Sequence, residues 1–411
     1  MSAPQPAPQF KIKQRKREIV TKLEPEVFRD NFVDAVTNED GEPIDIEKYA
    51  HVLELNADKL DYKKYAEPLF ELLLVGGLIA PGGTIQDGPR NPYSVFACAD
   101  DLAEIRVRVD IMTRTVRRYK YLQRRLEETM AHLLQYVNKF ADELPKFAKA
   151  FALFVSRQLL PLDALTHLLK EHLVKEGVAL EFMTCVFQAY VADASAANLQ
   201  TLLRKSQIGS KLLDFFPAAQ RSERDLKAFF ASKDLANVAE FHSQVQQVKI
   251  RDIALQRLHD IMSGGTPQEA GMYAKEQQAA HQWTELDTAT LLWEAAVTTI
   301  DFTGRTDQVD KHFQRVLQTF GPVLAVFCTS AKTELTLLLR IQHMAYEDAR
   351  LQKHFRTIVS ELYQTDVLSE SAIIYWFQKG ASPQGKSVFI KQMEPFIQWL
   401  QTAEDDDSEE E

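Results

Sequence analysis

The stretch Ile105-Arg-Val-Arg-Val-Asp-Ile-Met-Thr-Arg-Thr-Val-Arg-Arg-Tyr-Lys-Tyr-Leu-Gln-Arg-Arg-Leu-Glu-Glu-Thr-Met130 indicates the fold class of this chain. Its apolar residues follow one another at steps of three or four, which places them on one face of an α-helix. They are Ile105, Val109, Met112, Val116, Tyr119, Leu122, Leu126 and Met130. The opposite face carries Arg106, Arg114, Arg117, Lys120 and Arg124. The stretch therefore predicts one long amphipathic helix.

Helical spacing continues along most of the chain from about Leu23 onward. Helix breakers are sparse, with 15 Gly and 16 Pro in 411 residues, and many of them lie between periodic segments. Successive segments are separated by Leu160-Pro161, Glu176-Gly177 and Phe216-Pro217, a rhythm typical of stacked antiparallel helix pairs. The pattern predicts an all-α, solenoid-like fold, although no sequence repeat is visible.

Charge is concentrated at the two ends of the chain. The formal net charge is −10, and the last eight residues carry −7 of it, so the remainder carries −10 + 7 = −3. At the other end, the basic run Lys11 to Arg17 follows a Pro-rich opening, and segments of such composition do not fold alone. We expect a disordered basic arm at 1–24, an N-terminal helical domain at 25–240, a C-terminal domain at 241–403 and an acidic tail at 404–411.

Cysteine content and hydropathy limit the class of protein. Cys98, Cys185 and Cys328 are odd in number, far apart and without a C-x-x-C pair, which supports neither a disulfide framework nor a structural zinc site. Neither a signal-peptide pattern nor a run of about 18 uncharged apolar residues occurs. We expect a cytoplasmic protein that does not enter a membrane.

A leucine zipper is one alternative that the sequence suggests. Leu53, Leu60 and Leu74 lie on a heptad grid, but the grid position between the last two is Glu67, and Pro68 follows it. A coiled coil needs three or four unbroken heptads, so we expect no zipper.

The segment Gly380-Ala-Ser-Pro-Gln-Gly-Lys-Ser387 matches the phosphate-loop pattern G-x-x-x-x-G-K-[ST]. A phosphate loop leaves a buried β-strand and opens a helix, so that backbone N–H groups face the phosphates. The preceding residues, Ser371 to Lys379, have helical spacing instead. We expect an ordinary turn between two helices and no nucleotide site.

Motifs of known catalytic and metal sites are missing from the sequence. The ten histidines are scattered, and neither H-E-x-x-H nor G-x-S-x-G occurs. We expect no catalytic residue, no bound cofactor and no metal ligand in this chain.

Two aromatic and acidic segments near the C-terminus are the strongest functional signal. The first begins at Asp366, and Ser369 is placed to be the N-cap of a short helix. Helical spacing places Trp376 within the core-facing arc of that helix and Tyr375 on its flank. Asp366 and Glu370 are expected at the surface.

The second segment leads into the acidic tail. Phe389, Met393, Phe396 and Leu400 define a core stripe, and Trp399 projects from the edge of that stripe. An edge tryptophan can cover the aliphatic stems of lysines while nearby carboxylates pair with their ammonium groups. Each exposed ion pair contributes only about 0.2 to 1 kcal/mol, so many must act together. These features predict a docking surface for lysine-rich segments.

The acids of the tail are Glu404, Asp405, Asp406, Asp407, Glu409, Glu410 and Glu411. Ser408 lies among them in the pattern of an acidic-directed phosphorylation site, and a phosphate there would add about 1.5 to 2 negative charges. Simple solubilisation is the alternative interpretation of such a tail.

The basic face of residues 106–125, together with Lys11 to Arg17, suggests a second function, in which it contacts RNA phosphates. A solvated helix face is the plainer interpretation of the same residues. No RNA-binding motif with interleaved aromatic residues is present, and direct RNA contact stays an open alternative.

Several segments resemble one family of translation factors. The two aromatic and acidic segments resemble the C-terminal HEAT-type domain of initiation factor five and of the ε subunit of the exchange factor for initiation factor two. Nearly the whole chain is similar to the initiation factor five mimic proteins, once named for a supposed basic leucine zipper. The matching segments are Phe28–Phe32, Leu60–Tyr65, Ala80–Thr84, Arg117–Leu122, Leu173–Gly177 and Gly385–Phe389.

The resemblance implies a HEAT-like, MIF4G-like α-solenoid that regulates translation initiation without catalysis. It implies binding to the lysine-rich tail of the initiation factor two β subunit and to the c subunit of initiation factor three. Competition with factor five would repress initiation and tighten start-codon selection. Initiation factor one and the 40S preinitiation complex are further candidate partners, and we expect a monomer. Carried over residue by residue, the contact positions are Asp366, Glu370, Tyr375, Trp376, Trp399 and the acids of the tail.

One departure from factor five limits what is carried over. Factor five has an N-terminal zinc ribbon and an arginine that stimulates GTP hydrolysis. This chain has no cysteine pair near its N-terminus, and Arg15 in the basic arm is no equivalent. We therefore do not expect GTPase activation.

Overall fold

The computed structural model describes residues 23–408, with side chains to residue 402, and within that range the chain is helical. The extended pairings found there are two isolated bridges, Thr37 with Pro43 and Ile79 with Ile85. The prediction of an all-α fold is confirmed. The chain divides into two compact units, residues 1–244 and 245–411, and the division falls within helix α11 (Ala236–Gly264).

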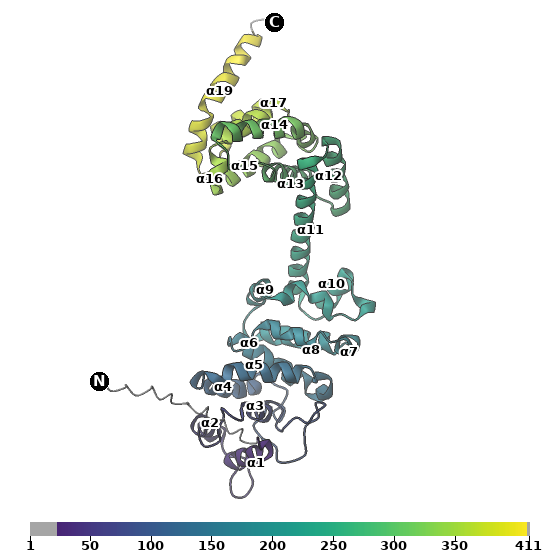
Figure 1. The fold of residues 1–411 in the computed structure, drawn as a ribbon, viewed down its shortest axis with the longest axis vertical. Helices are drawn as coiled ribbons and strands as arrows, with labels where there is room; N and C mark the ends of the chain where they lie inside the picture. The colour runs from purple at the N-terminus through teal and green to yellow at the C-terminus, as the bar shows by residue number, and fades with distance from the viewer. Residues whose placement is uncertain (1–22, 409–411) are drawn as a thin grey trace, which may run out of the picture. The chain divides into compact units, whose positions relative to one another are not determined.

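The first unit stacks its helices in two rows (Figure 1). One row contains α1 (Pro25–Val36), α3 (Ala66–Leu74) and α5 (Tyr121–Leu134), and the other contains α2 (Ile46–Leu55), α4 (Leu102–Arg118), α6 (Leu144–Ser156) and α8 (Val178–Asp193). Each helix packs against the helix two places along the chain, which is the arrangement of a solenoid built from helix pairs. Shorter elements complete the unit: α7 (Glu171–Lys175), α9 (Ala196–Lys205), α10 (Glu223–Ser232) and the 3₁₀ turns η1 (Val137–Glu143), η2 (Leu162–Leu168), η3 (Gln207–Ser210), η4 (Leu212–Phe215) and η5 (Ala218–Gln220).

The long helix predicted for residues 105–130 is wrong, because the structure has two helices there. Helix α4 ends at Arg118, the backbone of Tyr119 is not helical, and α5 begins at Tyr121. The hydroxyl of Tyr119 donates a hydrogen bond of 2.8 Å to the backbone oxygen of Glu54, which holds this corner against α2. The apolar stripe still faces the core on both helices, so the corner preserves the burial that the spacing predicts.

The breakers identified in the sequence do separate helical segments. Pro161 precedes η2, Gly177 takes the left-handed conformation (φ 79°) just before α8, and Pro217 precedes η5. A glycine pays no Cβ penalty in that conformation, so it can end one helix and start the next within two residues.

A charged network joins three helices of the first unit around Asp193 at the end of α8. Its carboxylate accepts hydrogen bonds from Arg106 of α4 and from Ser156 and Arg157 at the end of α6. Burial alone would raise the pKa of Asp193, but the hydrogen bonds from Ser156 and Arg106 and the two arginine charges hold it below its usual range. The network ties α4, α6 and α8 together at one edge of their row.

The second unit repeats the same stacking. One row contains α12 (Pro267–His281), α14 (Thr306–Ala325), α17 (Phe355–Gln364) and α19 (Lys386–Ser408), and the other contains α13 (Glu285–Thr298), α15 (Ala331–Glu347) and α18 (Glu370–Tyr375). The short α16 (Ala349–Gln352) precedes α17, and a π-helical turn, Trp376–Gly380, follows α18. One continuous apolar core, which includes Trp293 and Trp376, fills the space between the rows.

Caps define where the helices of the second unit begin. The Thr266 hydroxyl accepts from the backbone N–H of Glu269, and the Glu269 carboxylate accepts from the backbone N–H of Thr266 in return. Thr284 and Asp287 form the same reciprocal pair at the start of α13. Each capping box satisfies two backbone donors that a helix start leaves without partners.

Candidate functional site

The first aromatic and acidic segment follows the end of α17. Asp366 is exposed and adopts the left-handed conformation (φ 59°), which turns the chain between α17 and α18. Ser369 is the N-cap of α18, and its hydroxyl accepts a hydrogen bond from the backbone N–H of Ala372, as predicted. Glu370, in the first turn of α18, is half-buried. The turn thus holds two acids beside a helix start.

Glu334, in the first turn of α15, joins this group from a distant part of the sequence. One of its carboxylate oxygens accepts hydrogen bonds from the backbone N–H of Ser369, at 2.7 Å, and from the Ser369 hydroxyl. A hollow of about 480 Å³ lies beside these groups, and it is lined by Glu334, Tyr363, Gln364, Asp366, Leu368 and Ser369. Two carboxylates therefore border one small surface depression.

The second segment places an aromatic cluster next to that hollow. The Trp399 ring stacks on Phe396, with centroids 5.7 Å apart, and meets Tyr363 edge to face at 6.3 Å. Trp399 is 53% exposed, whereas Phe396 is buried. Tyr363 contacts the aromatic cluster and also lines the hollow that Asp366 borders, so it connects the two segments.

Trp376 does not lie on this surface. Its side chain is fully buried, and its indole N–H donates a hydrogen bond of 2.9 Å to the side-chain oxygen of Gln342. The expectation from the resemblance that Trp376 contacts a partner is therefore wrong for a direct contact, and the core position predicted from helical spacing is confirmed. Tyr375 is 52% exposed, but its ring packs near Gly380 and not against Trp399.

The loop that matches the phosphate-loop pattern is held by the same buried glutamine. Gln342 donates hydrogen bonds to the backbone oxygens of Ser382 and Gln384 and accepts one from the backbone N–H of Ser382. The residues before the loop form the π-helical turn and not a β-strand, and α19 follows it. The prediction of a turn between two helices is confirmed.

The acidic tail is described only in part. The backbone of α19 continues to Ser408, so Glu404, Asp405, Asp406 and Asp407 belong to its last turns, but the side chains of these residues lie outside the described structure. Glu409, Glu410 and Glu411 lie outside it entirely, as does the basic run Lys11 to Arg17. Their role in binding stays a prediction.

The basic face that suggested RNA binding is partly neutralised. Arg106 pairs with Asp193, and Arg124 and Arg125 both pair with Glu128. The corner at Tyr119 also distributes the remaining cations over two helices. Paired arginines offer less charge to a phosphate backbone, so the structure gives this alternative less support than the sequence does.

Sequence reasoning missed Glu334 and Tyr363. Glu334 is 35 residues from its partner Ser369, and only the packing of α15 on α18 brings them together. Tyr363 is three residues before Asp366, so extending the first segment by one helical turn would have included it.

Comparison with known proteins places both units in families. Residues 12–252 match the family model described as the 5MP1/2 HEAT domain, and residues 333–410 match the model described as eIF4-gamma/eIF5/eIF2-epsilon. The chain is 33% identical over 406 residues to eIF5-mimic protein 1 of Homo sapiens and of Rattus norvegicus, covering 97% of this chain and 96% of each relative. It is also 33% identical over 405 residues to the protein krasavietz of Drosophila melanogaster, covering 97% of this chain and 95% of that protein. Within residues 23–408, no helix combines the length and the apolarity that spanning a bilayer requires.

Proposed function

Because the chain belongs to the eIF5-mimic protein family, whose members are factor-like regulators of translation initiation, we propose that it regulates initiation without catalysis by binding initiation factors. Its partners in this proposal are the lysine-rich tail of the initiation factor two β subunit and initiation factor three. By occupying surfaces that factor five also needs, the chain represses initiation and tightens start-codon selection.

The observation that supports binding of a lysine-rich tail is that Tyr363 belongs both to the aromatic cluster with Trp399 and to the lining of the hollow that Asp366 borders. A lysine side chain that lies across Trp399 and Tyr363 buries its aliphatic stem on the two rings. Its ammonium group then reaches the hollow that Asp366 and Glu334 border. Cation–π attraction on an exposed ring contributes about 0.5 to 1 kcal/mol, and each exposed ion pair about 0.2 to 1 kcal/mol.

The tail extends this surface. Residues 404–411 add seven carboxylates just beyond Trp399 along the chain. A segment with several lysines can pair with many of them at once, so affinity grows through multiple weak contacts that share one anchoring site. Binding to initiation factor three is proposed from family membership, and the N-terminal unit is the part of the chain available for that contact.

A peptide titration tests the site. A synthetic lysine-rich peptide is titrated into the full chain and into the variant Trp399→Ala, for which we expect binding about 10-fold weaker, equivalent to about 1.4 kcal/mol. Tyr346→Ala is the matched control, because Tyr346 is an aromatic residue of similar exposure (49%) at the end of α15. Equal affinity of the Trp399→Ala variant and the parent chain would remove this surface from the mechanism.

A charge variant tests the acidic side of the same surface. Asp366→Asn removes the charge and keeps a residue that tolerates the left-handed conformation. Asp234→Asn is its control, because Asp234 is an exposed aspartate with nearly the same φ (58°) in the first unit. We expect weaker peptide binding only for Asp366→Asn.

Capture of factors from a nuclease-treated lysate separates protein binding from an RNA bridge. Initiation factors two and three should co-purify with the parent chain after nuclease treatment. Their loss on treatment would favour the basic face of residues 106–125 as the functional surface and would contradict the proposal.

A further inference from the structure

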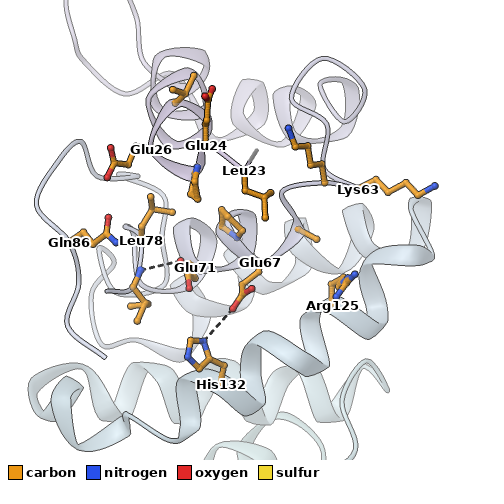
Figure 2. Close-up of a pocket in the computed structure, with 16 residues that line it drawn as sticks. Leu23, Glu24, Glu26, Lys63, Glu67, Glu71, Leu78, Gln86, Arg125 and His132 are labelled. Atoms are coloured by element: carbon orange, nitrogen blue, oxygen red, sulfur yellow. Dashed lines mark hydrogen bonds and ion pairs between the residues drawn. The ribbon is translucent and has the colours of Figure 1, made fainter. Parts of the chain in front are cut away.

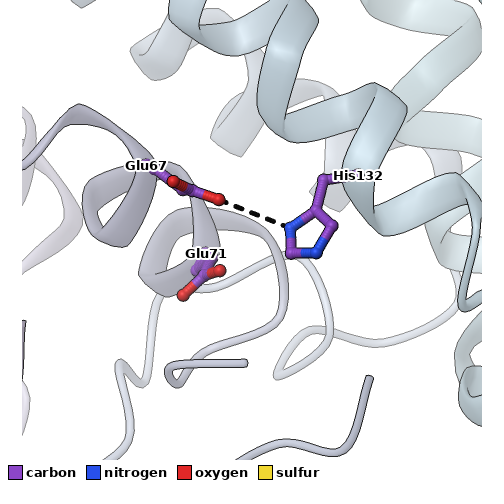
Figure 3. Close-up of side chains that lie close together, drawn as sticks. All are labelled: Glu67, Glu71 and His132. Carbon is purple, nitrogen blue, oxygen red and sulfur yellow. Dashed lines mark ion pairs between the residues drawn. The ribbon is translucent and has the colours of Figure 1, made fainter. Parts of the chain in front are cut away.

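A cluster of three side chains that could ligate a metal lies in the first unit, far in the sequence from the aromatic and acidic segments. Glu67 and Glu71 are one turn apart on α3, and His132 reaches the same point from α5, which packs on α3 (Figure 3). The nearest ligand atoms of the three side chains all lie within 4.8 Å of one another. Residues four apart on a helix share a face, so α3 directs both carboxylates toward α5.

Glu71 is a buried acid with little to compensate its charge. The residue is 6% exposed, and one carboxylate oxygen accepts a hydrogen bond of 3.1 Å from the backbone N–H of Ile79. No other hydrogen bond to this carboxylate is found among the described residues. Burial raises the pKa of Glu71 to about 7, with the Ile79 donor lowering it and the charge of Glu67 raising it further. A carboxylate buried in this way is stabilised by a cation or must take up a proton.

His132 presents a ring nitrogen without a hydrogen-bond partner in the described part of the chain. Its Nδ1 atom is buried and makes no hydrogen bond, although it lies 3.4 Å from a carboxylate oxygen of Glu67. The ring of Tyr136 packs edge to face against the imidazole at 5.3 Å, which fixes the ring orientation. A buried nitrogen without a hydrogen bond therefore lies beside the Glu67 carboxylate (Figure 3).

One separation suits a small ion with tetrahedral coordination, and the three ligand atoms all lie within 4.8 Å of one another. Zinc ligands of the nitrogen and oxygen type lie about 2.0 to 2.2 Å from the ion, so two ligands of a tetrahedral site are about 3.4 Å apart. The distance between His132 Nδ1 and Glu67 is 3.4 Å, the separation that such a site requires. At this distance the two side chains form an ion pair when His132 is protonated, and His132 Nδ1 has no hydrogen-bond partner among the described residues.

The cluster is accessible from solvent. It lies at the edge of a hollow of about 750 Å³ that Glu67, Glu71 and His132 line together with Leu23, Glu24, Glu26 and Gln86 (Figure 2). The hollow gives an ion an entry path and gives a water molecule room to be the fourth ligand. The cations Lys63, Lys64 and Arg125 also line the hollow, and the Arg125 guanidinium is paired with Glu128 at 2.7 Å.

From this geometry we propose that Glu67, Glu71 and His132 bind one divalent transition-metal ion, with Zn²⁺ as the best fit. Imidazole nitrogen selects zinc and its neighbours over magnesium and calcium, and two carboxylates neutralise the charge of the ion. The backbone donor from Ile79 orients Glu71, as an outer-shell partner does in known metal sites. The ion would link α3 to α5 and stabilise their packing.

Zinc titration of the full chain tests the proposal. Protein stripped with a chelator is titrated with ZnCl₂ against a chromophoric competitor, and we expect one tight site per chain. In Glu71→Gln the amide oxygen still accepts from Ile79, so the fold is kept while a ligand is lost. Glu67→Gln alters a residue exposed to solvent and disturbs no core contact. His132→Ala removes the nitrogen ligand.

Each of the three variants should lose more than the ~10- to 100-fold in affinity that is typical for removal of an outer-shell partner. Glu181→Gln is the matched control and should bind zinc like the parent, because Glu181 is an exposed glutamate of α8 that does not line the hollow. Weak zinc binding by the acidic tail is the same in the parent and in all variants, so it does not affect the comparison of their affinities. Cobalt substitution adds a spectroscopic readout, because a tetrahedral site with a histidine ligand gives visible absorption that His132→Ala must lose. The proposal is overturned if the parent binds no zinc tightly, or if Glu67→Gln and Glu71→Gln bind it as the parent does.

Discussion

Gln342 offers the sharpest test of how the C-terminal unit is held together. This fully buried side chain makes four hydrogen bonds, one from the Trp376 indole, one from the Ser382 backbone and two to backbone oxygens of the 382–384 loop. The substitution Gln342→Met keeps an unbranched side chain of similar volume and removes all four. A buried indole N–H without a partner costs about 1 to 3 kcal/mol, and each of the other bonds contributes at least about 0.5 kcal/mol. The expected loss is therefore at least about 2.5 kcal/mol.

Tryptophan fluorescence isolates this effect. All four tryptophans, Trp283, Trp293, Trp376 and Trp399, lie in the second unit, so urea unfolding followed by their emission reports that unit alone. With an m-value of about 1 to 3 kcal/mol per molar urea, the midpoint should fall by about 1 M or more. Gln398→Met is the control, because it makes the same exchange at an exposed position of α19 and should leave the midpoint unchanged. A loss below about 1 kcal/mol for Gln342→Met would refute the reasoning.

Trp376→Phe extends the test to function. It removes the indole donor, which costs about 1 kcal/mol, and it also shrinks a fully buried side chain, which adds a cavity penalty; Gln342 still accepts from Ser382. Because Trp376 is buried, this variant should bind the lysine-rich peptide normally wherever it is folded, whereas Trp399→Ala should not. Weak binding by fully folded Trp376→Phe would show that the surface depends on the core more than the contacts indicate.

The remaining predictions concern stability and are read by urea unfolding. Asp193→Asn should cost about 2 to 3 kcal/mol at neutral pH, because Arg157 and its neighbours lose a charged acceptor. The pKa of Asp193 is depressed in the folded chain. Its stabilising contribution is therefore present above the unfolded pKa of about 3.9 and is lost as the pH falls through the lower folded pKa. The difference in unfolding free energy between parent and variant, measured by circular dichroism, should shrink over that pH range. Thr266→Ala should cost about 1 kcal/mol in the tryptophan-reported transition, since it removes a capping box. Gly83→Ala should cost more than 1 kcal/mol, because φ is +86° and the added Cβ would meet the Tyr136 ring at 2.3 Å; a change within error would show that this loop adapts without strain.

Local spacing predicted the fold class because an amphipathic stripe records which face of a helix is buried. The same property hid the corner at Tyr119, since steps of three continue through it and neither Gly nor Pro marks the break. The apolar residues on either side of that corner are buried equally well by one long helix or by two shorter ones. The side-chain hydrogen bond from Tyr119 to the distant Glu54 backbone, which favours two, leaves no trace in local periodicity.

The candidate sites also combine features that local spacing predicts with features that depend on tertiary packing. The exposure of Trp399 and the burial of Trp376 followed from their angles to neighbouring apolar residues, which are local properties. The contact of Glu334 with Ser369 and the proximity of Glu71 to His132 depend on which helices stack, and the sequence alone did not reveal those neighbours. The cluster on α3 and α5 matches no ligand motif, because two of its members come from one helix and the third from another.

The row order of the second unit has a further consequence for its dynamics. Among the described residues, helix α19 follows α17 as the last member of its row, so within that part of the chain it is covered on one side and is the first candidate for fraying. A partner helix or strand laid over Trp399 would act as the missing next layer and would slow amide exchange along α19. Occupancy of this surface would then be readable as protection from proteolysis at the C-terminal end, even where the partner itself leaves no spectroscopic signal.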